Sequence, residues 1–276
     1  MSSAAQKFFL ANHALPTMPE VASRLIQSFD DDNASLASLA ELIGKDPALA
    51  AKVMRLANSA RYSPARSVST LKDAAAALGM DTLRNLALAA CLSGTFPVIP
   101  GLDRTRFWRH GITTAGYARI LSGALQLDAD TSYLAGLMLR TGQILMALAE
   151  PDQVADVEAR ALEPGSRFSL EMNRFACSHA EVTAELAARW KFPTPMIAAF
   201  RDASLPLEAR PFSLLAAVLH LAEILADAAQ QEIGASQALT QAAPELVQHL
   251  HLDLAFLEGK IAAAGDLGGD VDSLIQ

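Results

Sequence analysis

The sequence has few aromatic residues, two cysteines and no long apolar run. Its longest uninterrupted apolar stretch, residues 86–92, is far shorter than the roughly 20 residues that a membrane-spanning helix needs. Cys91 and Cys177 form no CxxC pair, so we expect buried thiols in a reducing compartment. The N-terminal segment lacks the basic region and long apolar region of a secretory signal. These absences predict a cytoplasmic protein with no membrane segment.

Positive charge is also in deficit. The formal net charge is −8 and the isoelectric point is near 5.2. Binding to nucleic acid depends on neutralising phosphates, and this balance argues against it. A modest basic grouping at Lys52, Arg55 and Arg61 has the spacing of a solvated helix face. We expect no nucleic-acid partner.

What the sequence does contain is helical patterning, rich in alanine, the best helix former. Capping signals recur, as in Ser178 with Glu181, and no strand-like alternation is found. The pattern therefore predicts an all-α protein. Longer helices are expected at about 103–125 and 131–149, and two weaker ones in the last 45 residues. Residues 94–101, with two prolines and two glycines, mark the best internal boundary.

The usual catalytic motifs are missing. The chain has no GxxxxGK[ST] or GxGxxG phosphate loop and no GxSxG nucleophile turn. His249 and His251 would point apart on a helix, and His13 and His179 have no partner at helical spacing. His220 shares a face with Glu223, but two residues hold a divalent ion poorly, so packing or a local hydrogen bond is the favoured interpretation.

Several segments together resemble the HDOD domain, the HD-related output domain of bacterial signalling proteins. The most specific are KDPALAAKVMRLANSARY at 45–62 and AAAALGMDTLRNL at 74–86. The similarity continues through FWRHGITTAGYARILS, SYLAGLMLRTGQILM, SHAEVTAELAARWKFPTP and VLHLAEILAD, and covers residues 15–230. It implies an HD-domain-like helical bundle with a smaller N-terminal helical subdomain.

The resemblance implies three parts. Residues 1–95 would form the N-terminal helical subdomain, 96–230 the HD-like helical subdomain, and 231–276 a helical C-terminal extension with a frayed tail.

In HD phosphohydrolases, a histidine, a His-Asp pair and a later aspartate bind the metal that activates water. Carried over by the resemblance, the first histidine falls on His110, the pair on Leu139 and Arg140, and the aspartate on Glu223. Leucine has no lone pair to donate, and arginine brings a permanent positive charge to the cation's position. The vestigial metal position therefore predicts no catalysis, no metal and no cofactor.

The same substitutions suggest a replacement for the metal. One hypothesis is that Arg140 pairs with Glu223, with His110 nearby, so that a salt bridge stabilises the interior in place of the ion. The alternative is that Arg140 extends to the surface and pairs with nothing.

Four residues of the N-terminal family motif also have two interpretations. They could line a recognition surface, or they could be structural, with Asp46 and Pro47 starting a helix and Asn58 at a helix end, where asparagine tolerates left-handed geometry. The structural interpretation is favoured for the set, which comprises Asp46, Pro47, Asn58 and Ser59.

The sequence thus predicts a non-catalytic bacterial regulatory protein that acts through protein–protein interaction with other signalling proteins. A small-molecule ligand is left open. One alternative is a divergent metal-dependent phosphohydrolase or phosphodiesterase that recruits another ligand such as His220. Another is a nucleotide or cyclic-dinucleotide sensor in which Arg140 and nearby basic residues hold a phosphate.

Overall fold

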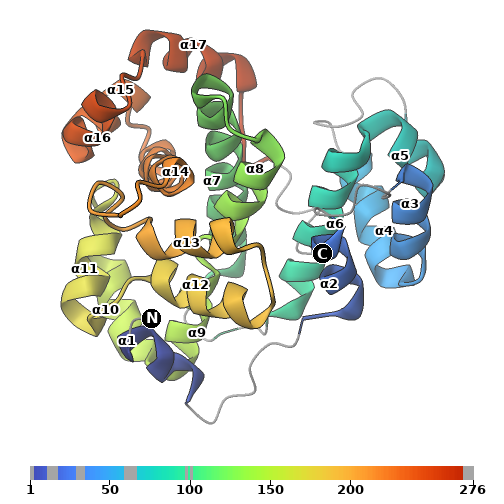
Figure 1. Cartoon of the computed structure of the whole chain (residues 1–276), viewed down its shortest axis with the longest axis horizontal. Coiled ribbons are helices and arrows are strands. Elements are labelled where there is room, and N and C mark those ends of the chain that lie inside the picture. Colours follow the sequence, from blue (N-terminus) through green and yellow to red (C-terminus); the bar gives the residue numbers. More distant parts are fainter. Residues whose placement is uncertain are drawn as a thin grey trace. The chain divides into compact units, whose positions relative to one another are not determined.

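The computed structural model describes residues 3–10, 18–28, 35–58, 67–96, 99 and 102–269. Every regular element in these ranges is a helix, and they contain no strand (Figure 1). The predicted all-α fold class is confirmed. No helix in the described ranges is both long enough and apolar enough to cross a bilayer.

The chain divides into two compact units. The smaller comprises residues 16–98, 104–109 and 268–276, and its core lies around α6 (Met80–Thr95). Its other complete helices are α2 (Glu20–Gln27), α3 (Leu36–Gly44), α4 (Pro47–Ala57) and α5 (Leu71–Leu78).

Two residues of the family motif start α4 as the sequence indicates. The Asp46 carboxylate accepts hydrogen bonds from the backbone N–H groups of Ala48 and Leu49, at 3.0 and 3.1 Å. Pro47 is the first residue of the helix, where its missing N–H costs nothing. Both residues thus have a structural role.

Asn58 ends α4 as expected for a helix-end residue, with a φ of −93°. Its side chain bridges two segments. The Nδ2 group donates to the carbonyls of Met54 and Val68, and Oδ1 accepts from the Val68 N–H at 2.7 Å. The amide therefore fixes residue 68 to the helix end. Ser59, the fourth motif residue, lies outside the described residues.

The larger unit comprises residues 1–15, 99–103 and 110–267. Helix α7 (Arg104–Leu125) belongs to this unit from His110 onward. The other elements are α1 (Ser3–Gln6), η1 (Lys7–Phe9), α8 (Ala129–Met138), α9 (Thr141–Ala149), α10 (Pro151–Arg160), α11 (Ser166–Phe175), α12 (His179–Arg189), α13 (Thr194–Asp202), α14 (Leu214–Gln230), α15 (Ala235–Ala242), α16 (Pro244–His249) and α17 (Leu254–Ala264).

The single helix predicted for 131–149 is wrong, because the chain breaks between α8 and α9 at Leu139 and Arg140. Thr183 of α12 stabilises the break. Its hydroxyl donates to the Leu139 carbonyl and accepts from the Gly142 N–H, both at 2.8 Å. A Cβ on Gly142 would lie 2.2 Å from the His179 carbonyl oxygen, so only glycine permits this crossing of α9 and α12.

The C-terminal segment holds three helices rather than the two predicted, because Pro244 starts a separate α16 after α15. Helix α15 packs on α14, and α16 and α17 pack on α15. Each of the three helices contributes one buried leucine to this core, namely Leu239, Leu246 and Leu257. The predicted frayed tail is packed at its start, since Leu267 is buried against Gly116. Residues 270–276 lie outside the described ranges.

Candidate functional site

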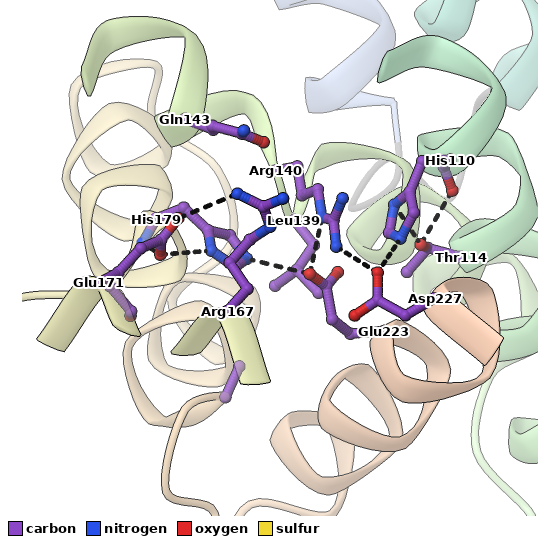
Figure 2. A network of polar contacts seen from close by, with 12 residues as sticks. His110, Thr114, Leu139, Arg140, Gln143, Arg167, Glu171, His179, Glu223 and Asp227 are labelled. Atoms are coloured by element: carbon purple, nitrogen blue, oxygen red, sulfur yellow. Dashed lines mark hydrogen bonds and ion pairs between the residues drawn. The ribbon is translucent and has the colours of Figure 1, made fainter. Parts of the chain in front are cut away.

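Four polar side chains from α7, α14 and the α8–α9 link meet inside the larger unit (Figure 2). Arg140 lies between two carboxylates. Its Nε donates to Glu223 Oε1 and its Nη2 to Asp227 Oδ1, each at 2.6 Å. His110 Nε2 lies 2.9 Å from the same Asp227 oxygen. We call His110, Arg140, Glu223 and Asp227 the central network.

At the two carboxyls of the central network, the neighbouring groups together outweigh the effect of burial on the pKa. Burial alone would raise the pKa of Glu223 and of Asp227, but the Arg140 guanidinium, together with smaller contributions from His110 and other neighbours, lowers both below their ordinary values. For Arg140, burial alone would lower the pKa, and the carboxylates raise it instead. The group is therefore a fixed arrangement of one cation and two anions.

His110 closes one end of the central network. Burial, followed by the charge of Arg140, lowers the pKa of the imidazole, although the bond to Asp227 opposes the shift. The neutral ring donates from Nε2 to Asp227, and its Nδ1 lies 3.2 Å from the Thr114 hydroxyl. The imidazole thus supplies a hydrogen bond without a second positive charge.

His179 lies at the other end and was missed as a site residue. It is fully buried at the start of α12, where Glu171 Oε2 accepts both its backbone N–H, at 2.6 Å, and its Nδ1–H, at 2.7 Å. The ring stacks on Phe168 with centroids 4.9 Å apart. Its Nε2 points toward Glu223 Oε1 at 3.6 Å and makes no hydrogen bond. The chain of polar groups therefore extends to α11 (Figure 2).

The predicted pairing of Arg140 with Glu223 is confirmed. The surface alternative fails, because Arg140 is only 8% exposed. Sequence reasoning missed Asp227, which contacts both Arg140 and His110. The available signal was its position four residues after Glu223, on the same helical face. Leu139 is buried and contributes its backbone carbonyl to Thr183.

His220 lies away from the central network. Its Nδ1 bonds the carbonyl of Ala203 at 2.8 Å, and its ring stacks on Phe168 on α11. The local hydrogen bond and packing favoured for this residue are thus present. His249 and His251 are both exposed, and His13 is outside the described residues.

The central network has donors for a metal but no place for one. His110, Glu223 and Asp227 each offer one ligand atom, and these atoms lie within 4.8 Å of one another. However, Arg140 already binds one oxygen of each carboxylate, and its charge repels a cation. The residues present therefore do not fit the divalent metal of HD phosphohydrolases.

Comparisons with known proteins agree with this architecture. A model of the HDOD domain family matches residues 15–206. A protein of Treponema pallidum (strain Nichols) with no assigned function is 27% identical over 195 residues. The match covers 68% of this chain and 37% of that relative, so the chain spans well under half of its length.

Three solved structures are similar over nearly the whole chain. A candidate phosphohydrolase from Shewanella amazonensis SB2B has a TM-score of 0.81 and 27% identity, covering 100% of this chain and 99% of its own. An HDOD domain protein of unknown function from Geobacter sulfurreducens has a TM-score of 0.76 and 22% identity, covering 99% and 97%. A candidate signal transduction protein from Marinobacter aquaeolei VT8 has a TM-score of 0.77 and 22% identity, covering 99% and 64%. The last two establish likeness of fold.

Proposed function

We propose that this chain, which belongs to the HDOD domain family, is a bacterial regulatory protein that binds other signalling proteins and hydrolyses no phosphoester. One observation carries the proposal. The guanidinium of Arg140 lies between the carboxylates that a metal would need, with both distances at 2.6 Å. Metal-dependent hydrolysis requires an ion with an open position for water. The two charge-assisted hydrogen bonds take one oxygen of each carboxylate and place a permanent positive charge where the ion would sit.

Family membership supports the signalling part of the proposal. The resemblance to an output domain of bacterial signalling proteins gives the class of partner, and the Marinobacter aquaeolei VT8 structure described as a candidate signal transduction protein has the same fold. In this interpretation, the central network stabilises a binding module and takes part in no reaction.

The principal alternative is a phosphohydrolase, favoured by the Shewanella amazonensis SB2B relative, which is described as a candidate for that activity. His220 does not serve this alternative well, because its Nδ1 is committed to Ala203 and it lies outside the group of three metal-capable residues. A phosphate sensor built on Arg140 is disfavoured because its guanidinium already pairs with Glu223 and Asp227 inside the protein.

Metal content and hydrolysis test the non-catalytic part directly. Protein purified without chelator should contain no stoichiometric iron, manganese or zinc, and added Mn²⁺ should produce no hydrolysis of bis-p-nitrophenyl phosphate. Stoichiometric metal, or turnover that Arg140→Met abolishes or enhances while the exposed control Arg160→Met leaves it unchanged, would overturn it.

The partner-binding part needs a separate experiment. The tagged chain, expressed at its natural level in the native bacterium, should crosslink to a defined signalling protein that copurifies at constant stoichiometry. Recombinant forms of both proteins should then bind in isolation. Failure of the purified pair to associate would contradict direct binding.

A further inference from the structure

The larger unit contains a cavity of about 500 Å³ that the proposed function does not use. Residues 166–173 of helix α11 and the turn before it form one wall, which includes Gly165 and Phe168. His220 of α14 and Leu205, which follows α13, form another part of the lining. Its volume lies within the range of about 300–1,000 Å³ typical of small-molecule sites.

His220 gives the cavity a defined hydrogen-bonding group. Because the Ala203 carbonyl can only accept, the Nδ1 of His220 carries the proton of this bond. Burial lowers the pKa of the ring, so the imidazole is neutral at neutral pH. Its Nε2 therefore has a free lone pair. This atom makes no hydrogen bond to the described residues, and the side chain lines the cavity.

The charges around the cavity select the ligand. Glu163 is the charged residue of the described lining, which contains no lysine or arginine. A neighbouring cavity of about 380 Å³ shares His220 and Leu205 and adds Glu208 and Glu245, again without a basic residue in the described lining. Such surroundings disfavour phosphates and carboxylates and favour a donor or a cation.

Apolar groups complete the chemistry. Phe168 and Ile224 are buried at the cavity wall, and Leu205 is 51% exposed beside it. The Phe168 ring stacks on both His179 and His220, with centroids 4.9 and 5.2 Å apart. We propose that this cavity binds a small organic amine with an apolar body, whose N–H donates to His220 Nε2.

The cavity wall is joined to the central network. Gly165 N–H donates to Asp227 Oδ2 at 3.1 Å. The Phe168 ring stacks on His220 and on His179. Gly165 adopts a φ of +77°, and an added Cβ would lie 2.7 Å from Ile224 Cγ1, which fixes this turn closely against α14. The cavity residues Gly165 and Phe168 therefore also contact Asp227 and His179, respectively. The site stands independently of whether the chain binds signalling proteins.

Two probes of the same shape and opposite charge test the proposal: 2-phenylethylamine and phenylacetate, measured by saturation-transfer NMR with the full chain. The amine should bind and the acid should not. Ser169→Trp, which places an indole in the cavity, should abolish the amine signal. Arg174→Trp on the same helix, outside the cavity, is the matched control and should leave it unchanged.

His220→Phe separates the role of Nε2 from that of the ring. Phenylalanine retains the stack on Phe168 but has no acceptor, so the affinity for 2-phenylethylamine should fall at least threefold while the thermal transition remains cooperative. The proposal is overturned if neither probe binds, if phenylacetate binds as well as the amine, or if Ser169→Trp or His220→Phe binds the amine like the unmodified chain.

Discussion

Arg140 Nη2 and Asp227 Oδ1 lie 2.6 Å apart although 87 positions separate the two residues in the chain. The contact joins the α8–α9 link to α14, and the same guanidinium also binds Glu223 one helical turn away. Arg140 is thus the shared cationic partner of both buried carboxylates. Removing one member therefore exposes the others to the full cost of desolvation.

Arg140→Met should lower the free energy of unfolding by roughly 3–5 kcal/mol, because it leaves two buried carboxylates without their counter-ion. Urea denaturation followed by circular dichroism measures the change. The matched control is Arg160→Met, which breaks an exposed pair with Asp156 and should cost at most about 0.5 kcal/mol. Equal losses in the two variants would show that the central network contributes no more than a surface pair.

Gly142→Ala should destabilise the chain by about 2 kcal/mol or more, since backbone atoms of His179 and Thr183 occupy the space of the new methyl group. The measurement is thermal or urea unfolding. Gly123→Ala in α7 is the control, because a Cβ there meets nothing within 4 Å. It should raise stability by roughly 0.5–1 kcal/mol through helix propensity. A neutral Gly142→Ala would contradict the tight crossing of α9 and α12.

Stability should decrease as the pH falls from 7. His110 and His220 have folded-state pKa values below their ordinary 6.5, and Glu223 and Asp227 lie below their ordinary 4.5 and 3.8. The unfolded chain therefore binds more protons in acid than the folded chain does. The histidines reduce the free energy of unfolding below about pH 7, and the carboxyls reduce it further below about pH 5. Urea midpoints between pH 8 and pH 4 measure the slope.

His110→Gln provides the control for this pH dependence. Glutamine keeps a donor for Asp227 but does not titrate, so the slope between pH 7 and 5.5 should shrink. The fall below pH 5 should remain. An unchanged upper slope would show that His110 is not a source of the linkage.

The two thiols should be unreactive in the folded chain. Cys91 and Cys177 are buried, and burial raises the pKa of each to about 12, so neither forms the reactive thiolate at pH 8. Ellman's reagent should titrate both only in denaturant. Because Cys91 belongs to the smaller unit and Cys177 to the larger, Cys91→Ala and Cys177→Ala variants report the opening of each unit separately. Rapid stoichiometric labelling in native buffer would contradict their burial.

Local signals in the sequence predicted the helices well because capping is a short-range interaction. The box at Ser178 with Glu181 forms as expected. The break after Met138 was not predictable in this way, because its cause, Thr183, lies on another helix more than forty positions later.

The residues of the site also differ in whether sequence patterns could predict their contacts. Arg140 and Glu223 could be paired from the sequence, since the resemblance placed both at one former metal position. His179 and Glu171 could not, because no helical spacing joins residue 171 on α11 to residue 179 on α12. Only the fold brings the carboxylate onto the imidazole, at 2.7 Å. Asp227 is intermediate. Its spacing places it on the same helical face as Glu223, but the sequence does not indicate which residues it contacts.

The double pairing of Arg140 also constrains how this chain can evolve. Introducing a His-Asp pair at 139–140 requires two substitutions, and each of them alone should cost stability. Arg140→Asp would gather three buried carboxylates without a counter-ion, and Leu139→His would place a polar ring at a position with no exposure. Both routes pass through a less stable protein, so a metal-binding pair at these positions can be acquired only across an intermediate of lower stability.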